Sequence, residues 1–297
     1  NPVLMGTEAG RCMAGGSKVI AIGYRAGCCA GVSDGSIFLG SYAGAKACNR
    51  AHGSIFIGGN AGNGGGTPSD VTGDDNIAMG GAALFNFTSG CRNTIIGGSA
   101  ANILSTGYNN VALGYVALGG GAVTGAYNVA IGDQAGKYIT SAQGSVAIGQ
   151  DALGCCGTTT GNYNIAIGER SGRGVTSAIG NVLLGRNAGR DLTTGSCNIG
   201  IGYHAMQDGT VTGANNIALG KLSLEQLTSG TDNIAIGQCA METGTVTGTH
   251  NIAIGCKAAK GITSAEANIF IGRGAGINNT ITGNQNVVLG SYAATNI

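Results

Sequence analysis

The sequence predicts an all-β protein, a parallel β-solenoid of about 17 coils. A phrase of the form Asn-x-Ala-Ile-Gly recurs along the 297 residues, as in 128–132 and 233–237. The glycine that ends this phrase is unvaried in 17 units, and most of the steps between units are 17 or 18 residues. Although 59 residues are glycine, there are only two prolines and 43% of the chain is hydrophobic, which excludes collagen and argues against disorder. A fixed period of this length indicates a solenoid, in which each unit buries its apolar face against its neighbours.

We call the unvaried glycine of each unit the anchor glycine. A glycine column of this kind predicts a backbone conformation with positive φ, or an approach too close for a Cβ atom. The anchor glycines are Gly6, Gly23, Gly40, Gly58, Gly80, Gly97, Gly114, Gly132, Gly149, Gly168, Gly185, Gly202, Gly220, Gly237, Gly255, Gly272 and Gly290.

A three-residue strand is expected directly before each anchor glycine. Its first and third residues are aliphatic and mostly β-branched, so we expect them to face the core of the coil. The expected strands are residues 3–5, 20–22, 37–39, 55–57, 77–79, 94–96, 111–113, 129–131, 146–148, 165–167, 182–184, 199–201, 217–219, 234–236, 252–254, 269–271 and 287–289.

The middle residue of each strand points to the opposite face, and it too is apolar, most often alanine. A strand that is apolar on both faces is expected to be buried on both. We therefore predict that chains self-associate, with the alanines packed around a common axis. The alternative is a wider coil that folds over itself. The predicted subunit-interface residues are Ala112, Ala130, Ala147, Ala166, Ala218, Ala235 and Ala253.

Two further columns frame the strand. Three residues after the anchor glycine stands alanine or serine, which predicts a tight interior crossing. Directly before the strand stands asparagine in 12 units, and serine in three more. These side chains are expected to hydrogen-bond along the stack or to close the turn. A Thr-Gly-x-x-Asn run supplies turn residues ahead of this position.

The sequence divides the solenoid into two parts of one continuous body. Residues 1–75 are predicted to be variant repeats, because their first four units lack the asparagine and place Phe38 and Phe56 in the middle of the strand. Residues 76–297 are predicted to be the regular Asn-x-Ala-Ile-Gly repeats.

The cysteines offer one candidate disulfide. Cys12 and Cys29 lie at the same position of consecutive units, so stacked coils would bring their Cα atoms to about 4.8 Å, within reach of a disulfide. The alternative is that most of the 10 cysteines are small buried side chains or free thiols. No Cys-x-x-Cys pair occurs and the three histidines are scattered, so no metal site and no cofactor is predicted.

Several function classes are excluded by composition and spacing. The net charge is +1 with 10% charged residues and no basic run, so no nucleic-acid partner is expected. No apolar stretch approaches the roughly 18 residues of a membrane span, so no membrane insertion is expected. A hexapeptide-repeat acyltransferase needs an aliphatic residue at every sixth position, and Lys137, six residues after Ile131, breaks that rule. Phosphate-binding loops are also absent, so we predict that the protein is not an enzyme.

The phrase Asn-x-Ala-Ile-Gly-x-x-Ala, followed by a threonine- and glycine-rich loop, resembles the head repeats of YadA-type trimeric adhesins. It is more similar still to repeats in bacteriophage tail fibres. The resemblance covers essentially the whole chain and implies a left-handed parallel β-roll, an elongated homotrimer and attachment to a cell surface. The coils here are longer than those of YadA-type heads, and the sequence has neither a coiled-coil stalk nor a membrane anchor. This favours a virion fibre or a released extracellular fibre over a complete bacterial adhesin.

The expected function is therefore attachment, with a host-cell glycan or protein as the receptor. Loop aromatics are the candidate receptor-binding residues, namely Tyr108, Tyr127, Tyr138 and Tyr163, although each could instead stack on the loop of the next coil. A purely structural extracellular filament is the first alternative. An ice-binding β-solenoid is a weaker one, since the threonine column stands beside turn glycines and not on the strand face.

Overall fold

The computed structural model describes residues 1–13, 15, 17–31, 33–46, 51–65, 72–154, 157–277 and 280–294. The chain divides into two compact units, unit 1 (Asn1–Gln150) and unit 2 (Asp151–Ile297). Each unit is a parallel β-solenoid with one short strand in each coil, and the described residues contain no helix. The predicted fold class is confirmed.

All the strands are three residues long and directly precede the anchor glycines, as predicted. Unit 1 contains β1 (Val3–Met5), β2 (Ile20–Ile22), β3 (Ile37–Leu39), β4 (Ile55–Ile57), β5 (Ile77–Met79), β6 (Thr94–Ile96), β7 (Val111–Leu113), β8 (Val129–Ile131) and β9 (Val146–Ile148). Unit 2 contains β10 (Ile165–Ile167), β11 (Val182–Leu184), β12 (Ile199–Ile201), β13 (Ile217–Leu219), β14 (Ile234–Ile236), β15 (Ile252–Ile254), β16 (Ile269–Ile271) and β17 (Val287–Leu289).

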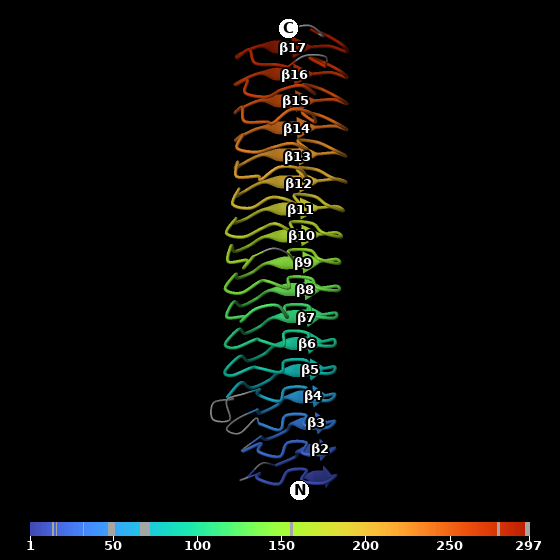
Figure 1. Cartoon of the computed structure of the whole chain (residues 1–297), viewed down its shortest axis with the longest axis vertical. Helices are drawn as coiled ribbons and strands as arrows, with labels where there is room; N and C mark the ends of the chain where they lie inside the picture. The colour runs from blue at the N-terminus through green and yellow to red at the C-terminus, as the bar shows by residue number, and fades with distance from the viewer. Residues whose placement is uncertain are drawn as a thin grey trace. The chain divides into compact units, whose positions relative to one another are not determined.

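Within each unit the strands stack in chain order, each parallel to the next (Figure 1). The pairing has no register shift: in unit 1 Ala112 lies beside Ala130, and in unit 2 Ala218 lies beside Ala235. Every column of the sequence repeat is therefore also a column of side chains in space.

The two faces of the strand are the reverse of those predicted. The middle residue points into the coil, whereas the first and third residues point outward and are half-buried or exposed. The predicted subunit-interface alanines are all fully buried inside a single chain, so that assignment is wrong: Ala112, Ala130, Ala147, Ala166, Ala218, Ala235 and Ala253 are each 0% exposed. The physical reason is space, because the interior of so narrow a coil accepts a methyl group more readily than a branched side chain.

The interior also receives side chains from the other side of each coil. Short parallel bridges join successive coils there, for example Leu192 to Val211 and Leu227 to Val246. These four side chains are fully buried. The small side chains of the strand column therefore face a column of larger aliphatic side chains from the opposite side of the coil.

The anchor glycines have the positive φ that their invariance predicted. Gly237 has φ +129°, and a Cβ added to it would lie 2.7 Å from the carbonyl oxygen of the next anchor, Gly255. Both the conformation and the close approach of stacked backbones therefore require glycine.

Buried asparagines form a hydrogen-bond ladder beside the strands. The backbone N–H and the side-chain Nδ2 of Asn233 both donate to Oδ1 of Asn216, at 3.0 and 3.1 Å, and Nδ2 also donates to the carbonyl of Gly248 at 2.8 Å. In unit 1, Nδ2 of Asn76 donates to the carbonyl of Gly73 in its own turn. Both expected uses of this column, along the stack and across the turn, are confirmed.

Unit 1 has an aromatic core that most of unit 2 lacks. The rings of Phe38, Phe56 and Phe87 are fully buried, and successive centroids are 5.6 Å apart. Gly44 makes room, because a Cβ there would lie 2.5 Å from the Phe38 ring. The predicted distinction between residues 1–75 and 76–297 does not coincide with the division into units, and it stays a prediction based on sequence.

Candidate interaction surfaces

An outward aliphatic face runs along the strands of each unit. It consists of the first and third strand residues, and we call it the strand face. The third residue is the more exposed, for example Ile96 at 40% in unit 1 and Ile201 at 38% in unit 2. Because the strands are paired in register, these side chains form continuous aliphatic columns at the solvent surface of each unit. Exposed apolar patches of this extent usually mark an interaction surface.

Two of the predicted receptor-binding tyrosines lie side by side. Tyr108 and Tyr127 occupy turns of consecutive coils, and their rings meet edge to face with centroids 5.4 Å apart. Both remain exposed, at 37% and 57%. Stacking on the next coil, the alternative reading of these residues, is confirmed for this pair, and exposed edges remain for a ligand.

The structure does not bring the other two tyrosines to the same place. Tyr163 is 61% exposed on unit 2. Tyr138 of unit 1 is only half-buried, lies near the Lys137 ammonium at 5.3 Å, and covers Gly120. A receptor-binding role for the four tyrosines stays a prediction.

The candidate disulfide is not formed. Cys12 and Cys29 are both free thiols, although the N–H of Cys12 donates to the carbonyl of Cys28 and so places their coils in register. Sγ of Cys29 instead lies 3.9 Å from Sγ of its buried neighbour, Cys28. Burial, together with the neighbouring thiols, raises the pKa of Cys28 to about 11, so this thiol is unreactive near neutral pH.

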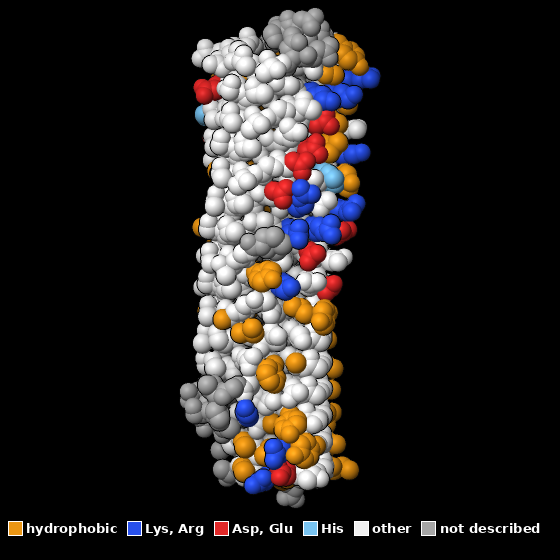
Figure 2. All heavy atoms as spheres, viewed as in Figure 1, with side chains coloured by type: hydrophobic (Ala, Val, Ile, Leu, Met, Phe, Trp, Pro, Cys, Tyr) orange, Lys and Arg blue, Asp and Glu red, His pale blue; other side chains and the backbone are white. Residues whose placement is uncertain are grey.

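Charged side chains gather on unit 2 (Figure 2). Arg190 binds both Asp191, at 2.7 Å, and Asp208 of the next coil, at 3.1 Å. Lys260 binds Glu242 at 2.9 Å, and the hydrogen bond to this carboxylate raises the pKa of Lys260. These pairs are partly exposed, so each contributes little to stability.

One histidine lies within this group of charges. Burial lowers the pKa of His204, and the positive charges of Arg186, Arg190 and Lys221 lower it further, against the opposing effect of Asp208. Burial also raises the pKa of Glu225, whose Oε1 lies 4.0 Å from Nδ1 of His204. Both shifts favour neutral forms, so this contact is polar and is not a strong ion pair.

A threonine face lies on the opposite side of the coil from the strand face, and sequence reasoning missed it. In alternate coils of unit 2 two exposed threonines flank a buried aliphatic residue, in 210–212, 245–247 and 280–282. In the coils between, the hydroxyls of Thr193 and Thr228 donate to carbonyls of the next coil. The sequence analysis placed one threonine of each pair beside a turn glycine, as Thr212 stands before Gly213, but it did not identify the second threonine that completes this face. The alternation of the threonines with Val or Ile was the available signal.

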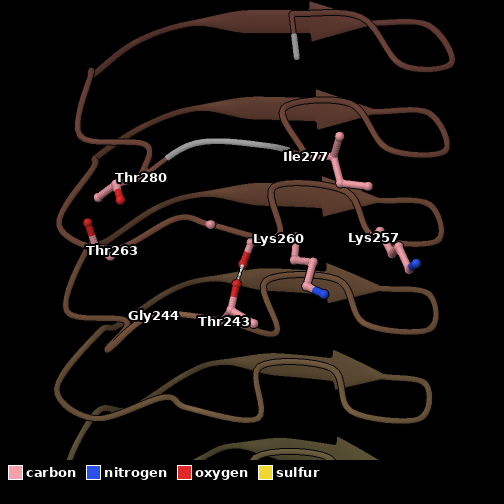
Figure 3. Close-up of a pocket in the computed structure, with 8 residues that line it drawn as sticks. Thr243, Gly244, Lys257, Lys260, Thr263, Ile277 and Thr280 are labelled. Atoms are coloured by element: carbon pink, nitrogen blue, oxygen red, sulfur yellow. Dashed lines mark hydrogen bonds between the residues drawn. The ribbon is translucent and has the colours of Figure 1, made fainter. Parts of the chain in front are cut away.

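Three polar hollows open on this side of unit 2, and each is lined by a glycine and by threonines of successive coils. The first, of about 300 Å³, is lined by Arg173, Gly174, Thr176, Arg190, Asp191, Thr193 and Thr210. The second, of about 200 Å³, is lined by Asp208, Gly209, Gln226, Thr228 and Thr245. The third, of about 510 Å³, is lined by Thr243, Gly244, Lys257, Lys260, Gly261, Thr263, Ile277 and Thr280 (Figure 3).

The described residues contain no group of three or more His, Cys, Asp or Glu side chains that could hold a metal ion. Nor do they include a helix with the length and apolar character of a membrane span. No protein-family model matches the chain, and no curated protein matches it.

Proposed function

We propose that this chain is a non-enzymatic attachment protein, a homotrimeric fibre segment that acts outside the cell or on a virion surface and binds to a cell surface. The observation that carries the proposal is the strand face, an aliphatic surface that every coil extends. Such a surface is stable in water only when something covers it.

A second copy of the chain is the best candidate to cover the strand face. The face repeats with the coils, so an identical repeating surface matches it along its whole length, which a small globular partner would not. Closed rotational symmetry then limits the assembly to a defined number of chains. The similarity of the repeats to those of trimeric fibres favours three.

The polar interior supports a structural role. Within the ladder, Oδ1 of Asn216 accepts two hydrogen bonds from Asn233, and Nδ2 of Asn216 donates to carbonyls. Asparagines used in this way hold the coils together and leave no group for catalysis. The variable side chains lie at the turns, where a receptor could reach them, and a trimer would present each of them three times and gain avidity.

The proposal is tested by incubating fluorescently labelled full-length protein with panels of whole cells and imaging the particle by negative stain. Saturable binding to some cells by particles of uniform length supports attachment. The absence of binding to every cell type would contradict it.

The same strand face favours one second candidate, a structural filament without a receptor. Copies would then associate end to end as well as side by side. Open-ended polymers in the micrographs, without binding to cells, would favour the filament.

A further inference from the structure

The three hollows of unit 2 repeat with a strict spacing of 35 residues, which corresponds to two coils. The equivalent positions are Gly174, Gly209 and Gly244; Thr193, Thr228 and Thr263; Thr210, Thr245 and Thr280; and the more variable sets Arg173, Asp208 and Thr243, and Asp191, Gln226 and Gly261. Paired strands lie about 4.8 Å apart, so successive hollows are separated by roughly 9.6 Å.

The glycine of each hollow keeps it open. Gly209 has φ +115°, and a Cβ there would lie 2.9 Å from the carbonyl oxygen of Leu227 and 3.2 Å from Cγ2 of Thr228. Gly244 has φ +100°, and a Cβ there would lie 2.8 Å from Cγ2 of Thr263. A side chain at this position would therefore fill the space between the corner of the coil and the threonine face.

Each hollow offers hydrogen-bonding groups that the protein leaves free. Thr210, Thr245 and Thr280 are exposed, and their hydroxyls make no hydrogen bond within the described residues. In the first hollow Nε of Arg173 is buried and also lacks a hydrogen-bond partner. A buried donor of this kind is costly unless a ligand or water satisfies it.

The charges exclude a uniformly charged ligand. The first and third hollows carry unbalanced basic groups, Arg173 and Lys257, whereas Asp208 lines the second. In Figure 3 Lys257 lies far from Thr263 and Thr280, at the other end of the third hollow. The second hollow has no basic side chain to bind a polyanion, and its carboxylate, Asp208, is paired with Arg190 at 3.1 Å. Arg173 and Lys257 disfavour a polycation at the other two, so a ligand that binds alike in all three is neutral and rich in hydroxyl groups.

The spacing excludes extended peptides. A β-strand advances about 3.3 Å per residue and alternates its side chains, so three residues would span the distance but turn opposite faces to successive hollows. A polyproline II helix has a suitable three-residue repeat. Proteins that bind such helices do so in grooves lined by aromatic side chains, and no aromatic side chain lines these hollows. An extended β-1,4-linked glycan repeats every disaccharide, over a length close to two coils.

We infer that the three hollows form one track that binds a neutral, extended polysaccharide, one disaccharide unit to each hollow. This inference rests on the proposed attachment function and names the chemical class of its receptor. Thr210, Thr245 and Thr280 bind sugar hydroxyls, and Arg173 Nε donates to a sugar oxygen at the first hollow.

The test is calorimetric titration of the full-length protein with cellobiose, cellotetraose and cellohexaose, chitohexaose, xylohexaose and mannohexaose, and an anionic hexagalacturonate. At least one neutral hexaose is expected to bind, more tightly than its disaccharide, because a longer chain reaches successive hollows. Binding of hexagalacturonate alone, or of no sugar on the panel, would overturn the inference.

The matched variants are two triple substitutions in the same coils. Thr210→Val, Thr245→Val and Thr280→Val removes the free hydroxyls at nearly constant shape, and affinity for the hexaose is expected to fall about fivefold for each threonine. The control is Thr212→Val, Thr247→Val and Thr282→Val, which changes exposed threonines two residues further on that line none of the hollows. Equal affinity in the two triple variants would overturn the inference.

A third variant fills a hollow without removing a threonine. Tyr138 of unit 1 stands six residues after its anchor glycine, as Gln226 does in the second hollow, and Cε1 of its ring would lie 3.0 Å from a Cβ at Gly120, the counterpart of Asp208 in the wall of that hollow. Gln226→Tyr is therefore expected to weaken hexaose binding while the circular dichroism spectrum is unchanged. Unweakened binding by this folded variant would count against the track.

Two further measurements separate the possible failures. If the wild type inhibits ice recrystallisation and the Thr210/Thr245/Thr280 variant does not, the threonines form an ice-binding face and the sugar track is wrong. If that variant still binds whole cells as the wild type does, the track is wrong but attachment stands. If the wild type binds the hexaose but no cells, the track stands and attachment fails.

Discussion

Unit 1 and unit 2 use the same coil but differ in what fills it and in what they present to solvent. Unit 1 buries three stacked phenylalanine rings and has serine at two consecutive positions of the asparagine column, Ser36 and Ser54. Unit 2 has asparagine throughout that column, a core in which alanines alternate with Leu, Val, Ile and Met side chains, and charges and open hollows on its surface. The same backbone repeat is therefore stabilised in two ways, by aromatic packing in unit 1 and by a continuous asparagine column in unit 2. Unit 2, whose asparagine column is the more regular, also has the more varied surface.

The largest effect is expected at the anchor glycines, where the two units should not differ. Gly40→Ala in unit 1 and Gly237→Ala in unit 2 each impose φ +129° on an alanine and bring its Cβ to 2.7 Å from a backbone carbonyl. We expect each to cost more than about 4 kcal/mol of unfolding free energy. Gly81→Ala is the control, because nothing lies within 4 Å of its Cβ position. Urea denaturation measures all three, and a strong effect in only one unit would refute the equivalence of the coils.

The next effect should distinguish the units. Phe56→Ala empties the aromatic core of unit 1 and is expected to cost about 3–4 kcal/mol. The reverse change in unit 2, Ala235→Phe, overpacks a coil in which both Ala235 and Met241 are already fully buried, and should cost about 2 kcal/mol of unfolding free energy. Thermal unfolding followed by circular dichroism compares the two. A stabilising effect of Ala235→Phe would show that unit 2 has unfilled space.

The asparagine ladder of unit 2 should contribute more to the free energy of unfolding than the serines of unit 1 do. Asn233→Ala removes the Nδ2 hydrogen bonds to Asn216 and Gly248 and the Oδ1 that accepts from Asn251, which leaves buried groups unpaired at an expected cost of about 3 kcal/mol. Ser54→Ala removes the hydroxyl that accepts from the N–H of Asn76 at 3.2 Å, and should cost about 1 kcal/mol. Equal urea midpoints for the two variants would contradict the difference between the columns.

The sequence located every strand to the residue, because an anchor glycine follows each one and an asparagine or serine precedes most of them. It did not reveal which face is inside. Hydrophobicity alone assigns the larger Ile and Val side chains to the core, whereas the narrow coil admits Ala130 and Ala235 and sends the aliphatic residues outward. The sequence alone could not predict the hollows either, because their shape depends on how coils of 17 and 18 residues place Thr193 beside Thr210 in space.

The smallest effect should depend on pH and be confined to unit 2. The pKa of His204 in the folded chain lies below the 6.5 of a free histidine, so the unfolded chain takes up the proton first. Stability is then complete above about pH 6.5 and declines as the pH falls toward the folded-state pKa. Glu225 acts in the opposite direction, because its raised pKa lets the folded chain keep this proton above pH 4.5, so its contribution to stability is lost as the pH rises. His204→Gln should flatten the profile of melting temperature between pH 7.5 and pH 5.5, and an unchanged profile would exclude His204 as its origin.

The central claim is that the strand face of each unit, exposed in the single chain, is covered by identical chains. The mass of the native full-length particle by sedimentation equilibrium tests this most directly. We expect a single species of three chains, each of 29.0 kDa, with no monomer at working concentrations. A stable, soluble species of 29.0 kDa would mean that water tolerates the aliphatic columns, and it would contradict the account.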